Sequence, residues 1–358
     1  MKEVLIHIGL HKTGSTAIQQ SLKNYRDDTT RYAFFGERFI NHSIIMKFIF
    51  KKKFQVPFRH RLLLSKKSEL KQLYMQQLKN QLNDNSFKRL IISAEDICNY
   101  EDFEKKEMLN FFQLNNCKCK ILCFVRNPNE LIASIANQRI KNGRNMEQIS
   151  PNFKKKILPF IDNLGLQHVN VFDYSYLIKN NIDLIDFVFK NLGIKKKIID
   201  LHGIKLKKNI NESQSLQAIA IIYKLNSLKL DFHRNPERMH ARKKIANTAK
   251  SIFALNKGFK KPDPLMFLGY TQKDSVEKDC KWLKDQFGIE YILNTNEYNE
   301  KNISKYFDEA LNSEHKNLQK FFSYFSTSFN KEISLEKNLL NLFIKLTKSK
   351  TKIFFFKN

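Results

Sequence analysis

The chain has 358 residues, and 42% of them are hydrophobic, which is enough for one large domain with a sizeable core. A formal net charge of +28 favours an anionic partner. Proteins encoded by AT-rich genomes are also rich in lysine, and this bias alone would give the same excess of positive charge. The sequence has no run of about 18 apolar residues and no secretory leader, which excludes a spanning helix and predicts a cytoplasmic protein, with peripheral attachment to the inner membrane surface left open.

The first residues combine an apolar run with a short polar turn. Val4–Gly9 has the pattern of a buried strand, the turn His11–Ser15 follows, and a helical pattern begins at Thr16. Such a turn aims backbone N–H groups and a helix N-terminus at one point, which suits a phosphate or sulfate group. The sequence therefore predicts a site for an anionic, nucleotide-like ligand. The alternative is an ordinary strand–turn–helix whose glycines only satisfy the backbone.

The order of residues in this turn differs from that of a nucleoside triphosphatase P-loop. Gly9 and Gly14 have the P-loop spacing, but Ser15 stands where that motif has its lysine, and the lysine of this turn is Lys12. No aspartate follows a neighbouring predicted strand in an obvious metal-holding position. We therefore expect a phosphate loop that does not hold a magnesium triphosphate, and a site without a metal.

Short apolar runs alternate with helical patterns along the first half of the chain. The predicted strands are Val4–Gly9, Tyr32–Phe35, Leu90–Ser93, Lys120–Val125 and Val169–Phe172. The predicted helices between them include Thr16–Tyr25, Glu69–Leu82, Phe103–Leu114 and Pro128–Ile140. This alternation predicts a P-loop-containing α/β fold of three layers, in which a central parallel sheet is flanked by helices on both faces.

Polar residues follow several of these predicted strands. Lys12 follows the first strand, Glu95 follows Leu90–Ser93, and Arg126 follows Lys120–Val125. Ligands of such folds bind at the carboxyl ends of the strands. We therefore expect Lys12, His11, Glu95 and Arg126 to lie along one edge of the sheet, with His42 as a further candidate after the second strand.

The remaining segments carry weaker patterns. Residues 45–68 are basic and have no clear period, and we expect Lys51-Lys52-Lys53 to be a solvated insertion. Residues 176–197 are expected to be helical and to stop at Gly193, and Asn211 or Ser213 to cap an apolar helix that ends near residue 225. A helix is expected near Asp274–Phe287.

The C-terminal section is rich in Phe, Leu and Lys. We divide the chain into an α/β domain over residues 1–300 and a basic helical extension over residues 301–358. A basic amphipathic helix of this kind suits packing on the domain or on a protein partner, and it equally suits an anionic membrane surface.

Five cysteines bear on the cellular compartment. They are Cys98, Cys117, Cys119, Cys123 and Cys280. None of their spacings matches a paired zinc motif, and three of the cysteines lie on or beside one apolar strand. Buried free thiols are expected, which suits a reducing compartment.

Two motifs together carry a resemblance to a known family. The first is His11-Lys12-Thr13-Gly14-Ser15-Thr16, and the second runs from Val125 through Arg126-Asn127-Pro128 to Ser134, eight residues after the arginine. They resemble the 5′-phosphosulfate loop and the 3′-phosphate segment of sulfotransferases that use 3′-phosphoadenosine 5′-phosphosulfate (PAPS), in particular the bacterial glycan-modifying type. The resemblance covers about residues 1–225, and weaker similarities include the Asn211–Ser213 segment.

The resemblance implies a role for each matching residue. The loop from His11 through Lys12, Thr13, Gly14 and Ser15 to Thr16 would hold the 5′-phosphosulfate, and Lys12 would stabilise the bridging oxygen in the transition state. Arg126 and Ser134 would hold the 3′-phosphate, and Asn211 would add a further donor contact.

The resemblance also implies a general base for an acceptor hydroxyl. Glu95 matches the glutamate bases of glycan sulfotransferases, and partial burial would raise its pKa for that task. His42 is the competing base. The implied reaction moves the sulfuryl group from PAPS to a carbohydrate or glycolipid acceptor in polysaccharide biosynthesis and needs no metal.

Two other classes of protein were weighed. A P-loop kinase or other phosphoryl transferase would need a lysine at Ser15 and an acidic metal-holding strand end. A non-enzymatic protein that binds nucleic acid or membrane would explain the charge, but the sequence carries no nucleic-acid-binding motif, so no nucleic-acid partner is expected.

Overall fold

A computed structural model describes residues 1–54, 65–144, 146–194, 214–228, 230, 236–293 and 300–354. The chain divides into two compact units. The first comprises residues 1–127, 152–210 and 277–291, and the second comprises residues 128–151, 211–276 and 292–358. The division therefore differs from the expected boundary at residue 300, because the helix after residue 128 groups with the C-terminal helices.

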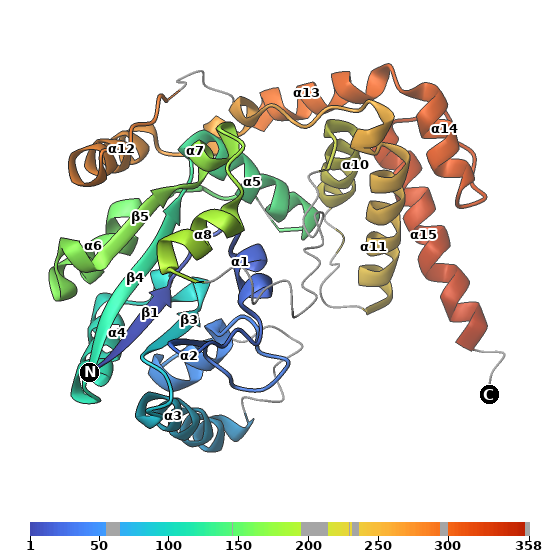
Figure 1. The fold of residues 1–358 in the computed structure, drawn as a ribbon. Helices are drawn as coiled ribbons and strands as arrows, with labels where there is room; N and C mark the ends of the chain where they lie inside the picture. Colours follow the sequence, from blue (N-terminus) through green and yellow to red (C-terminus); the bar gives the residue numbers. More distant parts are fainter. Residues whose placement is uncertain are drawn as a thin grey trace. The chain divides into compact units, whose positions relative to one another are not determined.

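The first unit is built on a five-stranded parallel sheet (Figure 1). Its strands are β1 (Lys2–His7), β2 (Thr30–Tyr32), β3 (Arg89–Ser93), β4 (Cys117–Val125) and β5 (Val169–Asp173). They lie in the order β2-β3-β1-β4-β5. All five predicted strands are confirmed, with their ends shifted by a few residues, and so is the α/β class of the fold.

The strand order places a topological switch at β1. Its two neighbours are β3 and β4, with Val4 opposite Leu90 on one side and Cys119 on the other. The chain moves from β1 toward β2 in one direction and from β4 toward β5 in the other. Connections that leave in opposite directions open a crevice at the carboxyl ends of β1 and β4, which is where ligands of open α/β sheets bind.

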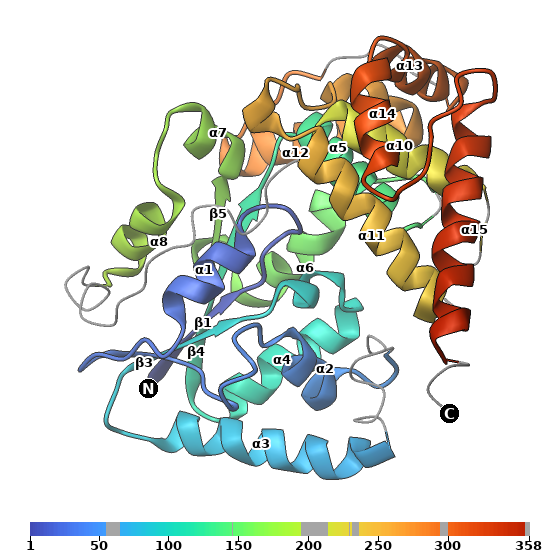
Figure 2. The same ribbon diagram turned by 90° about the vertical axis from the view of Figure 1, so that its right-hand side faces the viewer.

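Helices cover both faces of this sheet. The helices of the first unit are α1 (Ser15–Leu22), α2 (Ser43–Phe50), α3 (Lys67–Asn83), α4 (Asp102–Leu114), α6 (Phe153–Leu164), α7 (Tyr174–Lys179) and α8 (Leu184–Leu192), with most of α12 (Lys273–Phe287). Figure 2 shows α1 and α8 on one side of the strands and α4 and α6 on the other. This arrangement confirms the three layers expected from the sequence.

Alternate strand residues supply the two faces of the core. Leu5, Ile91 and Leu122 pack with Ile18 of α1 and Val188 of α8 in one buried cluster. The next residues along the strands, such as Val4 and Ile6, are also fully buried and belong to the opposite face. A strand buried on both faces reads as a continuous apolar run, which explains why the runs in the sequence predicted the strands.

Several local expectations are corrected by the structure. Residues 43–50 form α2, whose apolar side chains are buried, so the start of the stretch without a clear period is a core helix, whereas Lys52 and Lys53 after it are exposed, as expected. The segment after Phe172 forms two short helices, and Asp173 and Asp183 cap them. Gly193 ends the second of these helices at φ +62°, as expected.

The second unit is helical. It contains α5 (Pro128–Lys141), α10 (Leu216–Ser227), α11 (Pro236–Ile252), α13 (Glu300–Asn312), α14 (His315–Ser323) and α15 (Leu335–Phe354). Ser215, rather than Asn211 or Ser213, caps α10 by accepting a hydrogen bond from the Ala218 N–H; residues 195–213 lie outside the described part of the chain.

The C-terminal helices pack within this unit. Leu339, Leu342 and Phe343 of α15 are buried, and Lys224 of α10 pairs with Asp308 of α13 at 2.6 Å and with Glu336 of α15 at 2.8 Å. Of the two alternatives for the tail, packing is thus seen for the described residues. Within the same described ranges, no helix has the length and apolar character that crossing a membrane requires.

Candidate functional site

The loop between β1 and α1 has the backbone of an anion-binding turn. Gly9, Lys12 and Gly14 all have positive φ angles, of +38°, +71° and +80°. The buried Thr13 hydroxyl donates a hydrogen bond to the Leu10 carbonyl at 2.5 Å, which fixes the turn from inside. Because the first N–H groups of a helix have no partner within the helix, this turn directs them at the space above the strand end.

Close packing explains why this loop needs glycine at position 14. A Cβ atom there would lie 2.3 Å from Leu184 Cδ2 and 3.3 Å from Tyr174 Cε2. A side chain at position 14 would therefore require the Leu184 side chain to move, and the left-handed backbone disfavours one as well. The elements that follow β5 therefore hold the loop in place.

Lys12 and Arg126 lie together at the topological switch. Arg126 Nη1 donates a hydrogen bond to the main-chain carbonyl of Lys12 at 3.1 Å, and its guanidinium carbon lies 5.6 Å from the centre of the Tyr174 ring. Burial lowers the pKa of Lys12, nearby Glu95 opposes this effect, and Arg126 adds to it. Two cations beside an anion-binding turn form a site for a ligand with more than one negative group.

Two buried polar atoms beside Gly9 test whether such a ligand fits. Ser15 Oγ and His7 Nε2 are both shielded from solvent and have no hydrogen-bond partner among the residues that the structure describes. A Cβ atom on Gly9 would lie 2.5 Å from Ser15 Oγ and 3.3 Å from His7 Nε2. Buried polar groups normally have partners, so their convergence under the loop fits a bound oxyanion.

His7 itself is a core residue of β1, as its place inside the predicted strand suggests. Its side chain is fully buried, and its Nδ1 lies 2.8 Å from the Ser93 hydroxyl. Burial lowers the pKa of His7 to about 4, so the ring is neutral near neutral pH.

Glu95 follows β3 and lies beside the loop. Its Oε1 accepts a hydrogen bond from the Asn41 amide at 3.1 Å, and its Oε2 lies 3.8 Å from His11 Nδ1. Asn99, one turn further along the 3₁₀ helix Glu95–Asn99, places its amide nitrogen 3.2 Å from His11 Nε2. The loop after β1 and the turn after β3 thus meet through side chains.

The expected effect on the acidity of Glu95 is corrected by these contacts. The His11 side chain holds the pKa of Glu95 below its ordinary value; burial opposes this shift, and the Asn41 amide supports it. The sequence analysis expected burial to dominate and to raise this pKa. Neighbouring donors outweigh burial because both oxygens of the carboxylate face them.

His42 does not reach this group of residues. Its side chain is fully buried, and its ring packs against Tyr32 and Phe35 with centroid distances of 4.6 and 5.4 Å. Its Nδ1 accepts a hydrogen bond from the Ser93 N–H, so it ties α2 to the end of β3. The competing base expected from the sequence is therefore a core residue in this structure.

The three remaining residues that were predicted to bind the donor lie in different parts of the chain. Thr16 lies in the first turn of α1, directly after Ser15. Ser134 lies on α5 in the second unit, whereas Arg126 belongs to the first. Asn211 lies outside the described residues.

Sequence reasoning missed the two amides that hold the acidic side of the site. Neither Asn41 nor Asn99 was predicted to have a role. Both follow strands at the same sheet edge as Glu95, and position at a strand end was the one signal in the sequence that would have suggested them.

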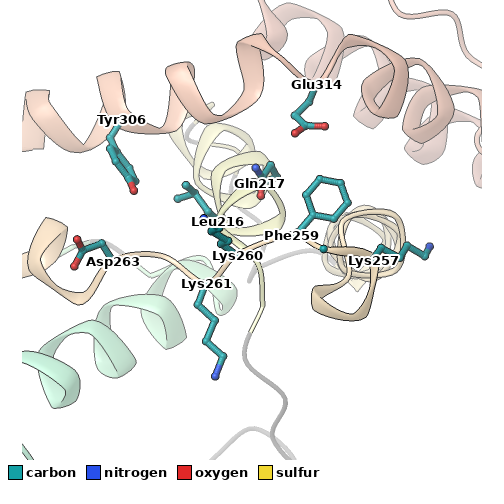
Figure 3. A pocket seen from close by; sticks show the side chains of 10 residues that line it. Leu216, Gln217, Lys257, Phe259, Lys260, Lys261, Asp263, Tyr306 and Glu314 are labelled. Atoms are coloured by element: carbon teal, nitrogen blue, oxygen red, sulfur yellow. The ribbon is translucent and has the colours of Figure 1, made fainter.

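A separate pocket of about 540 Å³ lies in the second unit (Figure 3). It lies beside the start of α10, and its lining includes Gln217, Phe259, Tyr306 and Glu314. Figure 3 shows Lys257 and Lys261 pointing away from its centre. None of the residues predicted from the sequence lines it.

Comparisons with known proteins add little to this geometry. No protein-family model matches the chain, and no curated protein matches it. Two similar solved structures are a sulfotransferase from Alicyclobacillus acidocaldarius and a sulfotransferase domain from the curacin biosynthetic pathway, each 13% identical to this chain. The first has a TM-score of 0.36 and covers 66% of this chain and 97% of its own; the second has a TM-score of 0.37 and covers 87% and 98%.

Proposed function

We propose that this protein is a sulfotransferase that moves the sulfuryl group of PAPS to a hydroxyl group of a carbohydrate acceptor. The observation that carries the proposal is the hydrogen bond between Arg126 and the Lys12 carbonyl, which brings the two sequence motifs together at one strand edge. The two motifs match the segments that hold the two ends of PAPS in the family that the sequence resembles.

The donor side would use charges that are already in place. The backbone of the loop and the buried Ser15 hydroxyl would hold the 5′-phosphate, and Lys12 would stabilise the charge that develops on the bridging oxygen as the sulfur–oxygen bond breaks. Arg126 would hold the 3′-phosphate through a charge-assisted contact. We also keep Ser134 and Asn211 as proposed donor ligands.

The acceptor side would use the group around Glu95. The acceptor oxygen forms a bond to sulfur while its hydroxyl proton leaves to a base. Glu95 with His11 supplies the acid–base centre beside the loop, at a distance of 3.8 Å between Oε2 and Nδ1. The carbohydrate or glycolipid acceptor rests on the resemblance of the motifs, as does a role in bacterial polysaccharide synthesis. The five free and buried cysteines fit a cytoplasmic location.

A phosphoryl transferase is the second candidate function, and the residues of the loop after β1 do not favour it. Ser15 occupies the position of the P-loop lysine. The carboxylates after β3 already face cations or donors, since Asp96 pairs with Lys47 at 2.5 Å and Glu95 faces His11 and Asn41. Neither carboxylate is therefore poised to hold a magnesium ion.

A binding and transfer experiment separates these functions. We expect the purified protein to bind PAPS and its product, 3′-phosphoadenosine 5′-phosphate (PAP), without Mg²⁺, and to transfer ³⁵S from labelled PAPS to a sugar hydroxyl in a panel of oligosaccharides. Lys12→Ala should nearly abolish transfer, because the charge on the leaving oxygen loses its fixed partner. Mg²⁺-dependent binding of ATP with no binding of PAPS would overturn the proposal.

A further inference from the structure

We propose that His11 is the general base of the reaction and that Glu95 is its positioning residue. This inference rests on the proposed function and refines it by assigning the atom that receives the proton. His11 was expected only as a ligand of the donor, and Glu95 as the base.

The two carboxylate oxygens of Glu95 are placed to orient His11. Oε1 accepts the Asn41 amide and Oε2 faces His11 Nδ1, so each oxygen has a donor in front of it. A carboxylate of this kind binds its proton weakly, which makes it a poor base and a good partner for an imidazolium ion. The Ser-His-Asp triad uses a carboxylate in this way to orient its histidine.

His11 has the exposure that a base requires. Its side chain is 42% exposed, against 26% for Glu95, and it lies directly before Lys12 on the loop. The Asn99 amide nitrogen lies 3.2 Å from Nε2. In the tautomer that carries its proton on Nδ1, facing Glu95, Nε2 accepts a hydrogen bond from the Asn99 amide. An acceptor hydroxyl that replaces the Asn99 amide could donate its proton to the lone pair of His11 Nε2.

The two carboxylates that face His11 come from one element, the 3₁₀ helix after β3. Glu95 and Asp96 of the turn after β3 face it, at 3.8 Å from Nδ1 and 3.9 Å from Nε2. Asp96 is paired with Lys47 at 2.5 Å, whereas Glu95 interacts with the Lys12 and His7 side chains. Glu95 is thus the carboxylate best placed to stabilise a proton gained by the ring.

The transfer step needs only the donor, the acceptor and the side chains of His11, Glu95 and Lys12. The acceptor oxygen forms its bond to sulfur, and the bond between sulfur and the bridging oxygen of the donor breaks. The hydroxyl proton moves to His11 Nε2, and the bridging oxygen leaves as part of the 5′-phosphate beside Lys12. Glu95 stays ionised and offsets the charge of the imidazolium ion.

The test is the pH dependence of kcat/KM for three variants, with PAP affinity measured on each by calorimetry. We expect His11→Ala to lower kcat/KM by about 10²- to 10⁴-fold, to remove the acidic limb of the profile, to keep PAP affinity, and to recover activity with added imidazole. Glu95→Gln should lower kcat by less than His11→Ala does, because the imidazolium ion loses its carboxylate, and it should keep an acidic limb. His240→Ala, at an exposed histidine of the second unit, is the matched control.

Each other outcome has a distinct meaning. If His11→Ala weakens PAP binding and leaves kcat unchanged, His11 is a donor ligand and the inference is wrong. If Glu95→Gln removes the acidic limb while His11→Ala keeps it, Glu95 is the base and the inference is wrong again. If the wild-type protein transfers no sulfuryl group from PAPS to any acceptor, the proposed function itself fails. Asn99→Ala provides a second test should His11→Ala fold poorly, since it should keep the acidic limb and PAP affinity.

Discussion

Arg126 Nη1 donates a hydrogen bond to the main-chain carbonyl of Lys12, across 114 positions of sequence and 3.1 Å of space. The bond joins the end of β4 to the loop after β1, the two neighbours at the topological switch of the sheet. It therefore holds Arg126 against the loop that carries Lys12, the two residues that we assign to the two ends of PAPS.

Arg126→Ala should weaken donor binding more than it slows the chemical step. Loss of a charge-assisted contact costs about 1.5–3 kcal/mol, so the Kd for PAP should rise by about 10- to 100-fold. Calorimetric titration with PAP measures this change. Arg26→Ala, at an exposed arginine of the first unit, should leave the Kd unchanged. An unaltered Kd in Arg126→Ala would remove this residue from the donor site.

Gly14→Ala should lower the unfolding free energy by more than the left-handed backbone conformation alone would account for. Both Gly14 and Gly193 have positive φ angles, but a Cβ at position 14 meets Leu184 at 2.3 Å, whereas one at position 193 has nothing within 4 Å. Gly193→Ala should therefore cost about 1–2 kcal/mol of unfolding free energy, the price of the left-handed conformation alone. Gly14→Ala should cost more and also lose PAP binding.

Urea unfolding and PAP titration of both glycine variants check this difference. Equal losses of unfolding free energy in the two variants, with PAP binding kept in both, would contradict the close packing seen around the loop.

Ser15→Ala should separate stability from binding. Because the buried Ser15 hydroxyl has no hydrogen-bond partner within the described part of the chain, its removal should leave the unfolding free energy unchanged or increase it. PAP affinity should fall by about fivefold to tenfold, since the 5′-phosphate would lose a hydrogen bond to the Ser15 hydroxyl that is worth about 1 kcal/mol. Thr13→Val is the matched control, because its hydroxyl bonds the Leu10 carbonyl and its loss should lower the unfolding free energy.

Chemical denaturation and PAP titration of the two hydroxyl variants give both quantities. A Ser15→Ala protein that is markedly destabilised but binds PAP normally would show that the hydroxyl supports the fold instead of the ligand.

Mild acid should destabilise the first unit through its buried histidines. Burial lowers the pKa of His42 to about 3 and that of His7 to about 4, from an ordinary value of 6.5. The unfolded chain therefore binds protons that the folded chain does not, and stability falls as pH drops from 6.5 toward 4. At pH 5 each histidine should account for about 2 kcal/mol of the loss.

Unfolding free energies at pH 7.5 and pH 5 test this effect. His42→Asn keeps an acceptor for the Ser93 N–H but cannot titrate in this range, so the difference between the two pH values should shrink by about 2 kcal/mol. An undiminished difference would mean that His42 is charged or solvated in the folded protein.

The acidic side of the site shows where sequence reasoning reached its limit. Glu95 was found because strand-end position follows from the apolar pattern of β3. The direction of its pKa shift was predicted wrongly, because that direction depends on His11 and Asn41, which lie 84 and 54 positions away and approach only when the sheet forms. His42 was placed at the same edge by the same rule, yet its ring turned inward between Tyr32 and Phe35.

The sequence by itself determined the strands, the α/β class and the place of the glycine turn after β1, because doubly buried strands leave continuous apolar runs and a tight turn with positive φ angles favours glycine. Only the tertiary structure decided that Arg126 meets Lys12, that α2 is core, and that Glu95 faces donors on both oxygens. These properties depend on strand order and on distances between remote residues. Local pattern does not encode them, since the same runs of residues are compatible with more than one sheet order.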